Sequence, residues 1–301
     1  MFISIMDDYA GFYSLLFFSV NHYLYCKKND ISFQLDTNIW MFKTKNGWTD
    51  YFKNIDFKGT NEENETKIVR HSDLLGDFPI HEYKEILLNE FYLYNDLTKE
   101  KINEAKIKYG LTEKGSYDSI FIRRGDKLCY ESDFFPTEKY VDLLLEKNPD
   151  CRIIFLQTDD YNCFLDIQKY ILDKNLDIKV ITLCNPETTG MVIKKDVFQR
   201  YTDKHHRQDN DVHNNYYSKV LKNLSQIKPV EEMNSEEIYQ HTMDMIIGVD
   251  IVLHSNYCIL DNQSNVSRFI CITHDSNEKV FDIRFPNENY DMNRTNCPAY
   301  N

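Results

Sequence analysis

Short apolar runs alternate with longer amphipathic stretches along most of the chain. Runs of strand length, many rich in β-branched and aromatic residues, occur at 2–6, 31–35, 118–123, 152–156, 178–183 and 257–260. Stretches with helical spacing of apolar residues lie between them, at 12–27, 81–94, 98–109, 137–147, 161–174 and 234–253. Strands that alternate with helices predict an α/β fold with a parallel, doubly wound sheet.

The length of 301 residues suits two domains. The first strand, a polar turn with Gly11, a helix and a second strand form a βαβ unit. The sequence predicts an N-terminal α/β domain at 1–110 and a C-terminal Rossmann-like domain at 111–301. Residues 185–217 are polar and irregular, which predicts a long loop or an insertion.

The charge of the chain narrows the class of ligand. A net charge of −13 argues against a large nucleic-acid-binding face, which needs a basic surface, and suits a local basic pocket for a small anion. The eight cysteines are scattered without metal-site spacing, which indicates buried, reduced thiols. No basic segment precedes an apolar one at the start, and the apolar stretch 12–24 is too short and polar to span a bilayer. We expect a soluble, cytoplasmic protein.

A cluster of charged residues follows the strand predicted at 118–123. Arg123, Arg124, Gly125, Asp126 and Lys127 stand in a row, in a chain with only nine arginines. Ligands of α/β sheets bind beyond the carboxyl ends of the strands, and guanidinium groups match phosphate oxygens in a rigid fork. One interpretation is therefore a diphosphate clamp. The other is a solvated turn with a surface ion pair to Asp126.

Two more polar clusters follow predicted strands of the same sheet, at 158–160 and at 264–268. The carboxyl ends of parallel strands lie at one edge of a sheet, so we expect the three clusters to converge. The cluster at 264–268 also opens a predicted helix, whose free N–H groups and dipole favour a phosphate. Together the clusters predict a nucleoside diphosphate site.

The same segments resemble the motifs of the α1,6-fucosyltransferase family, to which protein O-fucosyltransferases are distantly related. Ile122-Arg-Arg-Gly-Asp-Lys127 with Glu131 and Tyr140 is similar to the first motif, Phe155-Leu-Gln-Thr-Asp-Asp160 to the second and Ser264-Asn-Val-Ser-Arg268 to the third. The resemblance is collinear over most of the chain. It implies a GT-B-type glycosyltransferase with two Rossmann-like domains facing a cleft. It also implies inverting, metal-independent transfer of fucose from GDP-fucose to a glycan, of the α1,6 or α1,2 type.

The resemblance also implies roles in catalysis for the first motif. Arg123 and Arg124 would bind the GDP phosphates, and Arg124 would stabilise the leaving group. Asp126 and Lys127 would support donor contacts, with Lys127 also part of the catalytic group, and Glu131 would be the general base on the acceptor hydroxyl. Metal-independent transfer agrees with these residue types, because two guanidinium groups can supply the positive charge that a divalent metal ion supplies in metal-dependent transferases.

Further donor-site residues are implied by the other motifs and by their surroundings. The resemblance implies that Asp159 and Asp160 shape the donor site and that Ser264 holds a phosphate. It also implies that Asp250 approaches the guanine. The remaining candidates for contact with the donor are Tyr140, Asn265 and Ser267. The family often has a histidine just before the arginines, where this chain has Phe121. Recognition of guanine is therefore expected to rest on other residues.

Some features have simpler interpretations. Asp209-Asn210-Asp211 has the form of a metal-binding DxD motif but follows no predicted strand, so it indicates a solvated loop, and the spacing of His205, His206 and His213 fits no standard metal site. Two other functions stay open for the chain: a GDP-sugar-binding protein without catalysis, and a transferase that uses another GDP-deoxysugar.

Overall fold

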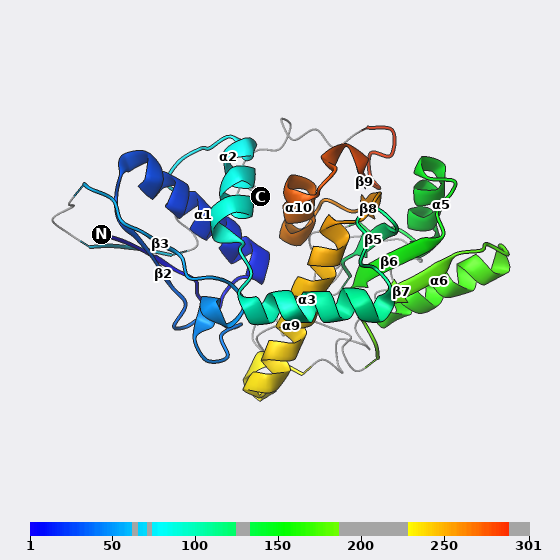
Figure 1. The fold of residues 1–301 in the computed structure, drawn as a ribbon, viewed down its shortest axis with the longest axis horizontal. Coiled ribbons are helices and arrows are strands. Elements are labelled where there is room, and N and C mark those ends of the chain that lie inside the picture. The colour runs from blue at the N-terminus through cyan, green and yellow to red at the C-terminus, as the bar shows by residue number, and fades with distance from the viewer. Residues whose placement is uncertain (62–65, 71–73, 125–132, 187–227, 289–301) are drawn as a thin grey trace. The chain divides into compact units, whose positions relative to one another are not determined.

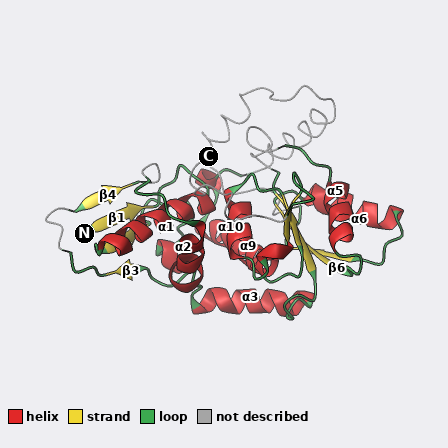
Figure 2. Ribbon diagram, turned by 90° about the horizontal axis from the view of Figure 1, so that it is seen from above, coloured by secondary structure: helices red, strands yellow, loops and turns green. Residues whose placement is uncertain are grey.

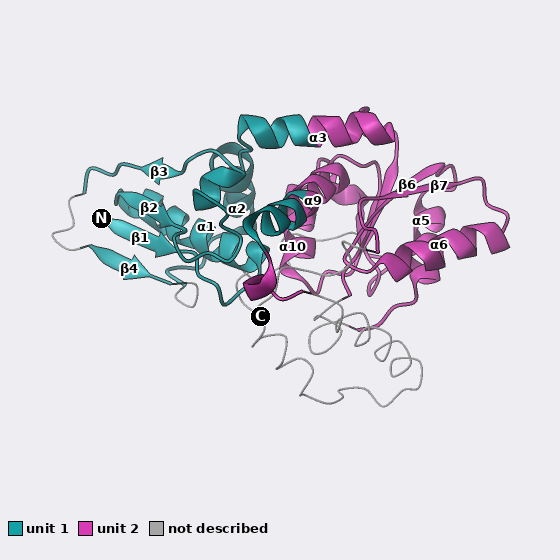
Figure 3. Ribbon diagram, turned by 90° about the horizontal axis from the view of Figure 1, so that it is seen from below, with its two compact units in different colours: residues 1–101, 234–243, 291–301 teal, residues 102–233, 244–290 magenta. Residues whose placement is uncertain are grey.

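The predicted α/β architecture with parallel sheets is confirmed (Figure 1). The computed structural model describes residues 1–61, 66–70, 74–124, 133–186 and 228–288. The chain divides into two compact units, which Figure 3 shows in different colours. The first contains residues 1–101 and 234–243, and the second contains 102–233 and 244–290. The chain passes from the first unit to the second within α3 (Asp96–Tyr109), returns to the first between Met233 and Asn234, and passes to the second again within α9 (Ser235–Leu253). The expected boundary at 110/111 lies at the carboxyl end of α3.

The first unit is built on a four-stranded sheet of order β3-β2-β1-β4. Strand β1 pairs in parallel with both β2 and β4, while β3 is antiparallel to β2. An aromatic core supports it, in which the rings of Trp48 and Phe52 stack with centroids 4.2 Å apart. Its elements are β1 (Phe2–Ile5), α1 (Phe12–Asn29), β2 (Phe33–Asp36), β3 (Asp56–Phe57), β4 (Lys67–Val69) and α2 (Ile80–Ile86), with a 3-10 turn at Gly47–Asp50 and a π turn at Leu87–Phe91.

The second unit contains a five-stranded sheet in which every paired strand is parallel, in the order β7-β6-β5-β8-β9. Its strands are β5 (Asp118–Ile122), β6 (Ile153–Thr158), β7 (Lys179–Thr182), β8 (Cys258–Leu260) and β9 (Val280–Asp282). Its helices are α5 (Thr137–Lys147), α6 (Tyr161–Asp173) and α10 (Asn265–Thr273), with 3-10 turns at Val230–Glu232 and Asn277–Lys279.

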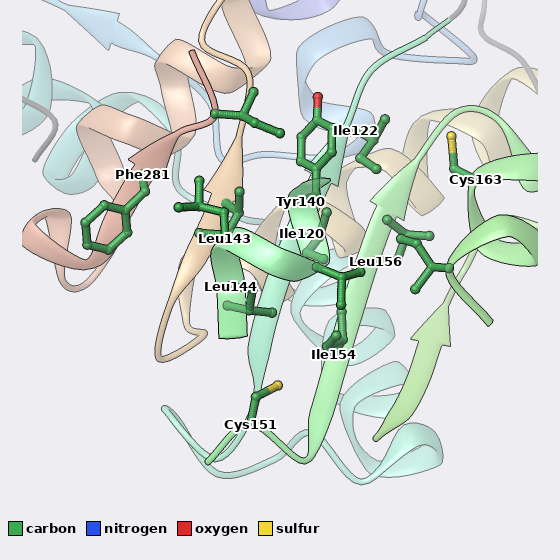
Figure 4. Close-up of a cluster of buried hydrophobic side chains, with 14 of the residues drawn as sticks. Ile120, Ile122, Tyr140, Leu143, Leu144, Cys151, Ile154, Leu156, Cys163 and Phe281 are labelled. Atoms are coloured by element: carbon green, nitrogen blue, oxygen red, sulfur yellow. The ribbon is translucent and has the colours of Figure 1, made fainter. Parts of the chain in front are cut away.

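Helices cover both faces of this sheet (Figure 2). Ile120 and Ile154 point to the face covered by α5 and α6, where they join Leu144 in a buried apolar cluster (Figure 4). Helix α9 packs on the other face, where a Cβ at Gly248 would lie 1.8 Å from Gln157 Oε1. Without a Cβ at this position, the end of the Gln157 side chain packs directly against the helix. Because both faces are buried, the strands are continuously apolar, as the sequence suggested.

Local signals in the sequence are reproduced at several element ends. Helix α9 opens with a capping box of the sequence form Asn-x-x-Glu: Asn234 Oδ1 accepts from the N–H of Glu237, and the N–H of Asn234 donates to Glu237 Oε2 at 2.7 Å. The helix expected at 81–94 is instead a short α-helix followed by a π turn that ends at Phe91. The three-residue strand β9 was not predicted. No helix in the described parts of the chain is both long and apolar enough to cross a membrane.

Candidate functional site

The strand order of the second unit defines where a ligand is expected. Numbered along the chain from β5, the sheet order is 3-2-1-4-5, so the order reverses between β5 and β8. Open α/β sheets bind ligands outside the carboxyl ends of the strands at this switch point. The segment after β5 begins with Arg123 and Arg124, and the segment after β8 leads to Ser264 at the start of α10. Two of the three predicted polar clusters therefore flank the switch point.

The arginine turn after β5 is held by the neighbouring strand. Arg123 forms an ion pair with Asp159, which follows β6. The backbone N–H of Arg124 donates to the same carboxylate, to Asp159 Oδ1 at 2.7 Å. Strands β5 and β6 pair in register up to Ile122 and Thr158, so the two segments leave the sheet side by side. The predicted convergence of these two clusters is therefore seen directly.

The side chain of Arg124 is buried, with 1% of its surface exposed. Its guanidinium lies 4.5 Å above the ring centroid of Phe134 and donates to the backbone carbonyl of Phe135. The interpretation of Arg124 as part of a solvated turn is therefore wrong. These two contacts fix the orientation of the guanidinium.

Asp159 and Asp160, which follow β6, make different structural contacts. Asp159 holds the arginine turn, as described above. Asp160 is the N-cap of α6, where its Oδ1 accepts hydrogen bonds from the backbone N–H of Asn162 at 3.0 Å and from Asn162 Nδ2 at 2.8 Å. The N–H of Asp160 donates in turn to the hydroxyl of Thr158 at 3.2 Å. These aspartates shape the edge of the sheet through contacts within the protein.

The third cluster opens helix α10. Ser264 is the N-cap, and its Oγ accepts from the N–H of Ser267 at 3.2 Å and lies 2.7 Å from Ser267 Oγ. Asn265 Oδ1 accepts from the guanidinium of Arg268 at 3.1 Å. The hydroxyl of Ser264 is thus used within the helix cap. What the cap offers at the switch point is the positive end of a nine-residue helix.

Tyr140 and Asp250 occupy separate surroundings. Tyr140 lies on α5 within the apolar cluster beside Ile122 (Figure 4). Burial raises the pKa of Tyr140, and the nearby Arg124 lowers it, so the tyrosine lies within electrostatic reach of the arginine turn. Asp250 does not join this group. It lies on α9, with its Oδ2 2.6 Å from the ammonium group of Lys106.

Asp250 belongs to an ion-pair network near the amino ends of the strands. Its Oδ1 is 3.7 Å from His254, whose Nδ1 contacts Asp275 Oδ2 at 2.8 Å; Asp275 also pairs with Lys114. Lys114 precedes β5, and Asp275 precedes β9. Burial alone would raise the pKa of Asp250, but contacts with His254 and Lys106 hold it below its ordinary value. This placement gives no support to the predicted contact with guanine.

The remaining candidates of the first motif lie outside the described residues. Asp126, Lys127 and Glu131 fall in the segment 125–132, and the DxD motif and the three histidines near it fall in 187–227. The flanks of 125–132 are described. Arg124 is held by Asp159, and the N–H of Asp133 donates to Gln263 Oε1 at 2.7 Å, in the loop between β8 and α10. The described residues on either side of that segment, Arg124 and Asp133, are therefore both held near the switch point.

Sequence reasoning missed one charged group at the same edge. Asp261 directly follows β8, Asp282 is the last residue of β9, and Arg284 comes two residues later. Arg284 contacts Asp282 with both Nε and a terminal nitrogen, the latter at 2.5 Å, and its Nε lies 3.3 Å from Asp261 Oδ1. Burial raises the pKa of Asp261 to about 7; Arg284 lowers it, while Asp282 and Asp133 raise it further. The only sequence signal was that Asp261 directly follows a predicted strand.

The described segments hold no group of three or more His, Cys, Asp or Glu side chains placed to bind a metal ion. The six cysteines in these segments are buried free thiols.

Two α/β units, the second with a parallel sheet of order 3-2-1-4-5, define a GT-B-like architecture. Among solved structures, the chain is similar to the fucosyltransferase NodZ from Bradyrhizobium, with a TM-score of 0.54 over 90% of this chain and 93% of that one, at 9% identity. It also aligns with NodZ alpha-1,6-fucosyltransferase soaked with GDP-fucose, with a TM-score of 0.49 over 90% and 92% of the chains, at 8% identity.

The likeness to the Bradyrhizobium protein shows a shared fold. The second alignment has a TM-score below 0.5 and is not used as evidence for the fold. No protein-family model matches the sequence, and no curated protein matches it.

Proposed function

We propose that this protein is a glycosyltransferase that moves L-fucose from GDP-fucose to a hydroxyl group of a glycan, forming an α1,6- or α1,2-type linkage. The observation that carries the proposal is the arginine turn. Arg123 and Arg124 are held by Asp159 at the switch point of a Rossmann-like sheet, and the amino end of α10 follows the adjacent strand. The GT-B-like fold shared with NodZ supports it.

The donor diphosphate would lie between the carboxyl ends of β5 and β8. Arg123 and Arg124, with Lys127, would bind its oxygens, and the N–H groups at the start of α10 would add donors and a partial positive charge. As the bond between the anomeric carbon and the phosphate oxygen breaks, negative charge grows on GDP. Fixed guanidinium groups stabilise that charge without reorganisation, so no metal ion is required in this mechanism.

The acceptor would attack the anomeric carbon from the opposite face, with inversion. Glu131 would take the proton of the acceptor hydroxyl as its oxygen forms the new bond to the sugar. Removal of that proton by a positioned carboxylate is worth about 10²–10⁴-fold in rate. The role of Glu131 rests on its spacing after the arginine turn and on the resemblance of the first motif.

Release of GDP from GDP-fucose, measured with a panel of glycan acceptors, tests this proposal. We expect acceptor-dependent release that persists in excess EDTA. Glu131→Gln should abolish transfer while GDP binding stays close to wild type; the control Glu138→Gln changes an exposed residue on α5 and should leave transfer unchanged. A protein that binds GDP-fucose but releases no GDP with any acceptor would be a sugar-nucleotide-binding protein instead. Release that requires a divalent ion would contradict the mechanism.

A further inference from the structure

Asp261 follows β8 at the edge of the sheet that carries the candidate donor site, and it has no role in the mechanism above. Phe121 pairs with Leu260 in the sheet, so Asp261 follows level with Ile122, one residue before the arginine turn. Neighbouring strands are about 4.8 Å apart. A diphosphate held by Arg124 and the amino end of α10 would therefore lie close to this carboxyl group.

The side chain of Asp261 is largely withdrawn from water, with 12% of its surface exposed. Its Oδ1 is buried and accepts no well-aligned hydrogen bond within the described residues, although the backbone N–H of Gln263 donates to the carboxyl group. Arg284 Nε is 3.3 Å from this oxygen, but that guanidinium is committed to Asp282 through three hydrogen bonds. A buried carboxylate oxygen without a donor is costly, because its lost hydration is not replaced.

The charges around Asp261 also oppose its ionisation. Asp282 and Asp133 act on it as like charges, Arg284 is the opposing cation, and Tyr140 faces it from α5. Two further carboxylates thus share one guanidinium with Asp261. Burial and these neighbours raise its pKa to about 7, so the group is ready to hold a proton near neutral pH.

We propose that Asp261 binds the diphosphate of the sugar nucleotide as a neutral carboxylic acid, whose O–H donates to a phosphate oxygen, so that donor binding takes up one proton. This inference rests on the proposed function. A bound diphosphate adds negative charge beside an already crowded carboxyl group and so favours its protonated form. The proton satisfies two acceptors at once, the buried oxygen of Asp261 and the anion.

Isothermal titration of the full-length protein with GDP-fucose, without acceptor, tests the proposal. Each phosphate of this ligand has one ester bond and one anhydride bond and keeps only one strongly acidic hydroxyl, so neither phosphate titrates near neutral pH. The apparent dissociation constant should rise about tenfold between pH 6 and pH 8, as expected for a required proton on a group of pKa about 7. At pH 8 the binding heat in two buffers of different ionisation enthalpy should show uptake of nearly one proton.

Three variants test whether the proton taken up on binding of GDP-fucose is held by Asp261. Asp261→Asn should make the affinity nearly independent of pH and remove the buffer dependence of the heat. The control Asp275→Asn changes a carboxylate before β9, in the network near the amino ends of the strands, and should keep the full proton uptake. Asp282→Asn removes a like charge and releases Arg284 toward Asp261, so it should move the pH dependence to lower pH.

The outcomes separate this inference from the proposed function. If GDP-fucose fails to bind at any pH, the proposed function is wrong. If it binds to the wild-type protein without proton uptake at pH 8, or with proton release, the inference is overturned while the proposed function stands. Proton uptake that persists in Asp261→Asn also overturns it.

Discussion

The backbone N–H of Arg124 donates to Asp159 Oδ1 at 2.7 Å and so joins the ends of two neighbouring parallel strands. The same carboxylate forms the ion pair with Arg123. One side chain therefore sets both the backbone and the side-chain geometry of the arginine turn. The two residues are 35 positions apart in the sequence, and the pairing of β5 with β6 brings them together.

Asp159→Asn should weaken the contacts that hold the arginine turn while it keeps a side chain of nearly the same shape and volume. The amide oxygen can still accept from Arg124, but the charge that balances Arg123 is lost. We expect a loss of about 1–3 kcal/mol in the free energy of unfolding and weaker binding of GDP-fucose. Urea unfolding and calorimetry measure the two effects. Asp173→Asn, at the exposed end of α6, is the matched control and should change neither.

Arg124→Lys should keep the positive charge but remove the planar set of parallel N–H donors of the guanidinium. A lysine ammonium cannot copy the two parallel hydrogen bonds of a guanidinium, nor its planar contact with Phe134. We expect kcat/KM to fall about 10²–10³-fold, mostly in kcat, because the lost interaction grows in the transition state. Arg152→Lys, exposed just before β6, should stay near wild type. A variant Arg124→Lys with unchanged kcat would exclude Arg124 from leaving-group stabilisation.

Substitutions at Ser264 separate the helix cap from the anion site. Ser264→Asp retains a good N-cap for α10, but Ser264 is buried, so the larger, charged side chain should lower the stability of the protein somewhat. Its negative charge would repel a diphosphate at the same helix end, so affinity for GDP-fucose should drop more than tenfold. Ser264→Asn, which caps without charge, serves as the control. Equal affinities in the two variants would place the diphosphate away from α10.

His274 should make the protein sensitive to acid. Its side chain is fully buried, with Nε2 3.2 Å from Ser255 Oγ, and burial lowers its pKa to about 4. The unfolded chain binds a proton between about pH 6.5 and pH 4 that the folded chain rejects, so stability falls as the pH falls through this window. The loss amounts to about 3 kcal/mol at full extent.

His274→Gln removes the titrating group, so urea unfolding at pH 7 and pH 5 should show a smaller acid loss than wild type. Wild type and His274→Gln must be compared, because Asp261 changes the stability in the opposite direction. The pKa of Asp261 is raised in the folded protein, so its ionised form destabilises the fold. Asp261 therefore favours the folded state as the pH falls from 7 toward 4. Equal acid losses in wild type and His274→Gln would show that His274 is protonated in the folded state.

Much of the second unit is predictable because its signals are local or continuous. The capping box of Asn234 and Glu237 needs four consecutive residues, and the apolar runs of β5 and β6 reflect burial on both faces. The last strand of the sheet is three residues long and follows a turn, so it carries no periodicity. Short strands acquire their identity from the sheet that they join.

Part of the candidate site follows from the sequence for the same reason. Residues directly after the strands, such as Arg124 and Asp159, follow from the fold class. Asp250 lies near the end of a helix that precedes a parallel strand, and such a helix ends near the amino end of that strand, at the edge opposite Arg124. The pairing of Asp261 with Arg284 joins two strand ends and depends on burial, which no spacing in the sequence encodes.

The central claim is that a nucleoside diphosphate binds between the carboxyl ends of β5 and β8. A crystal structure of the protein with GDP tests it most directly. The account predicts both phosphates within hydrogen-bonding distance of the Arg123 and Arg124 side chains and of the first N–H groups of α10. GDP bound at another place, with both arginines turned away from it, would contradict the account.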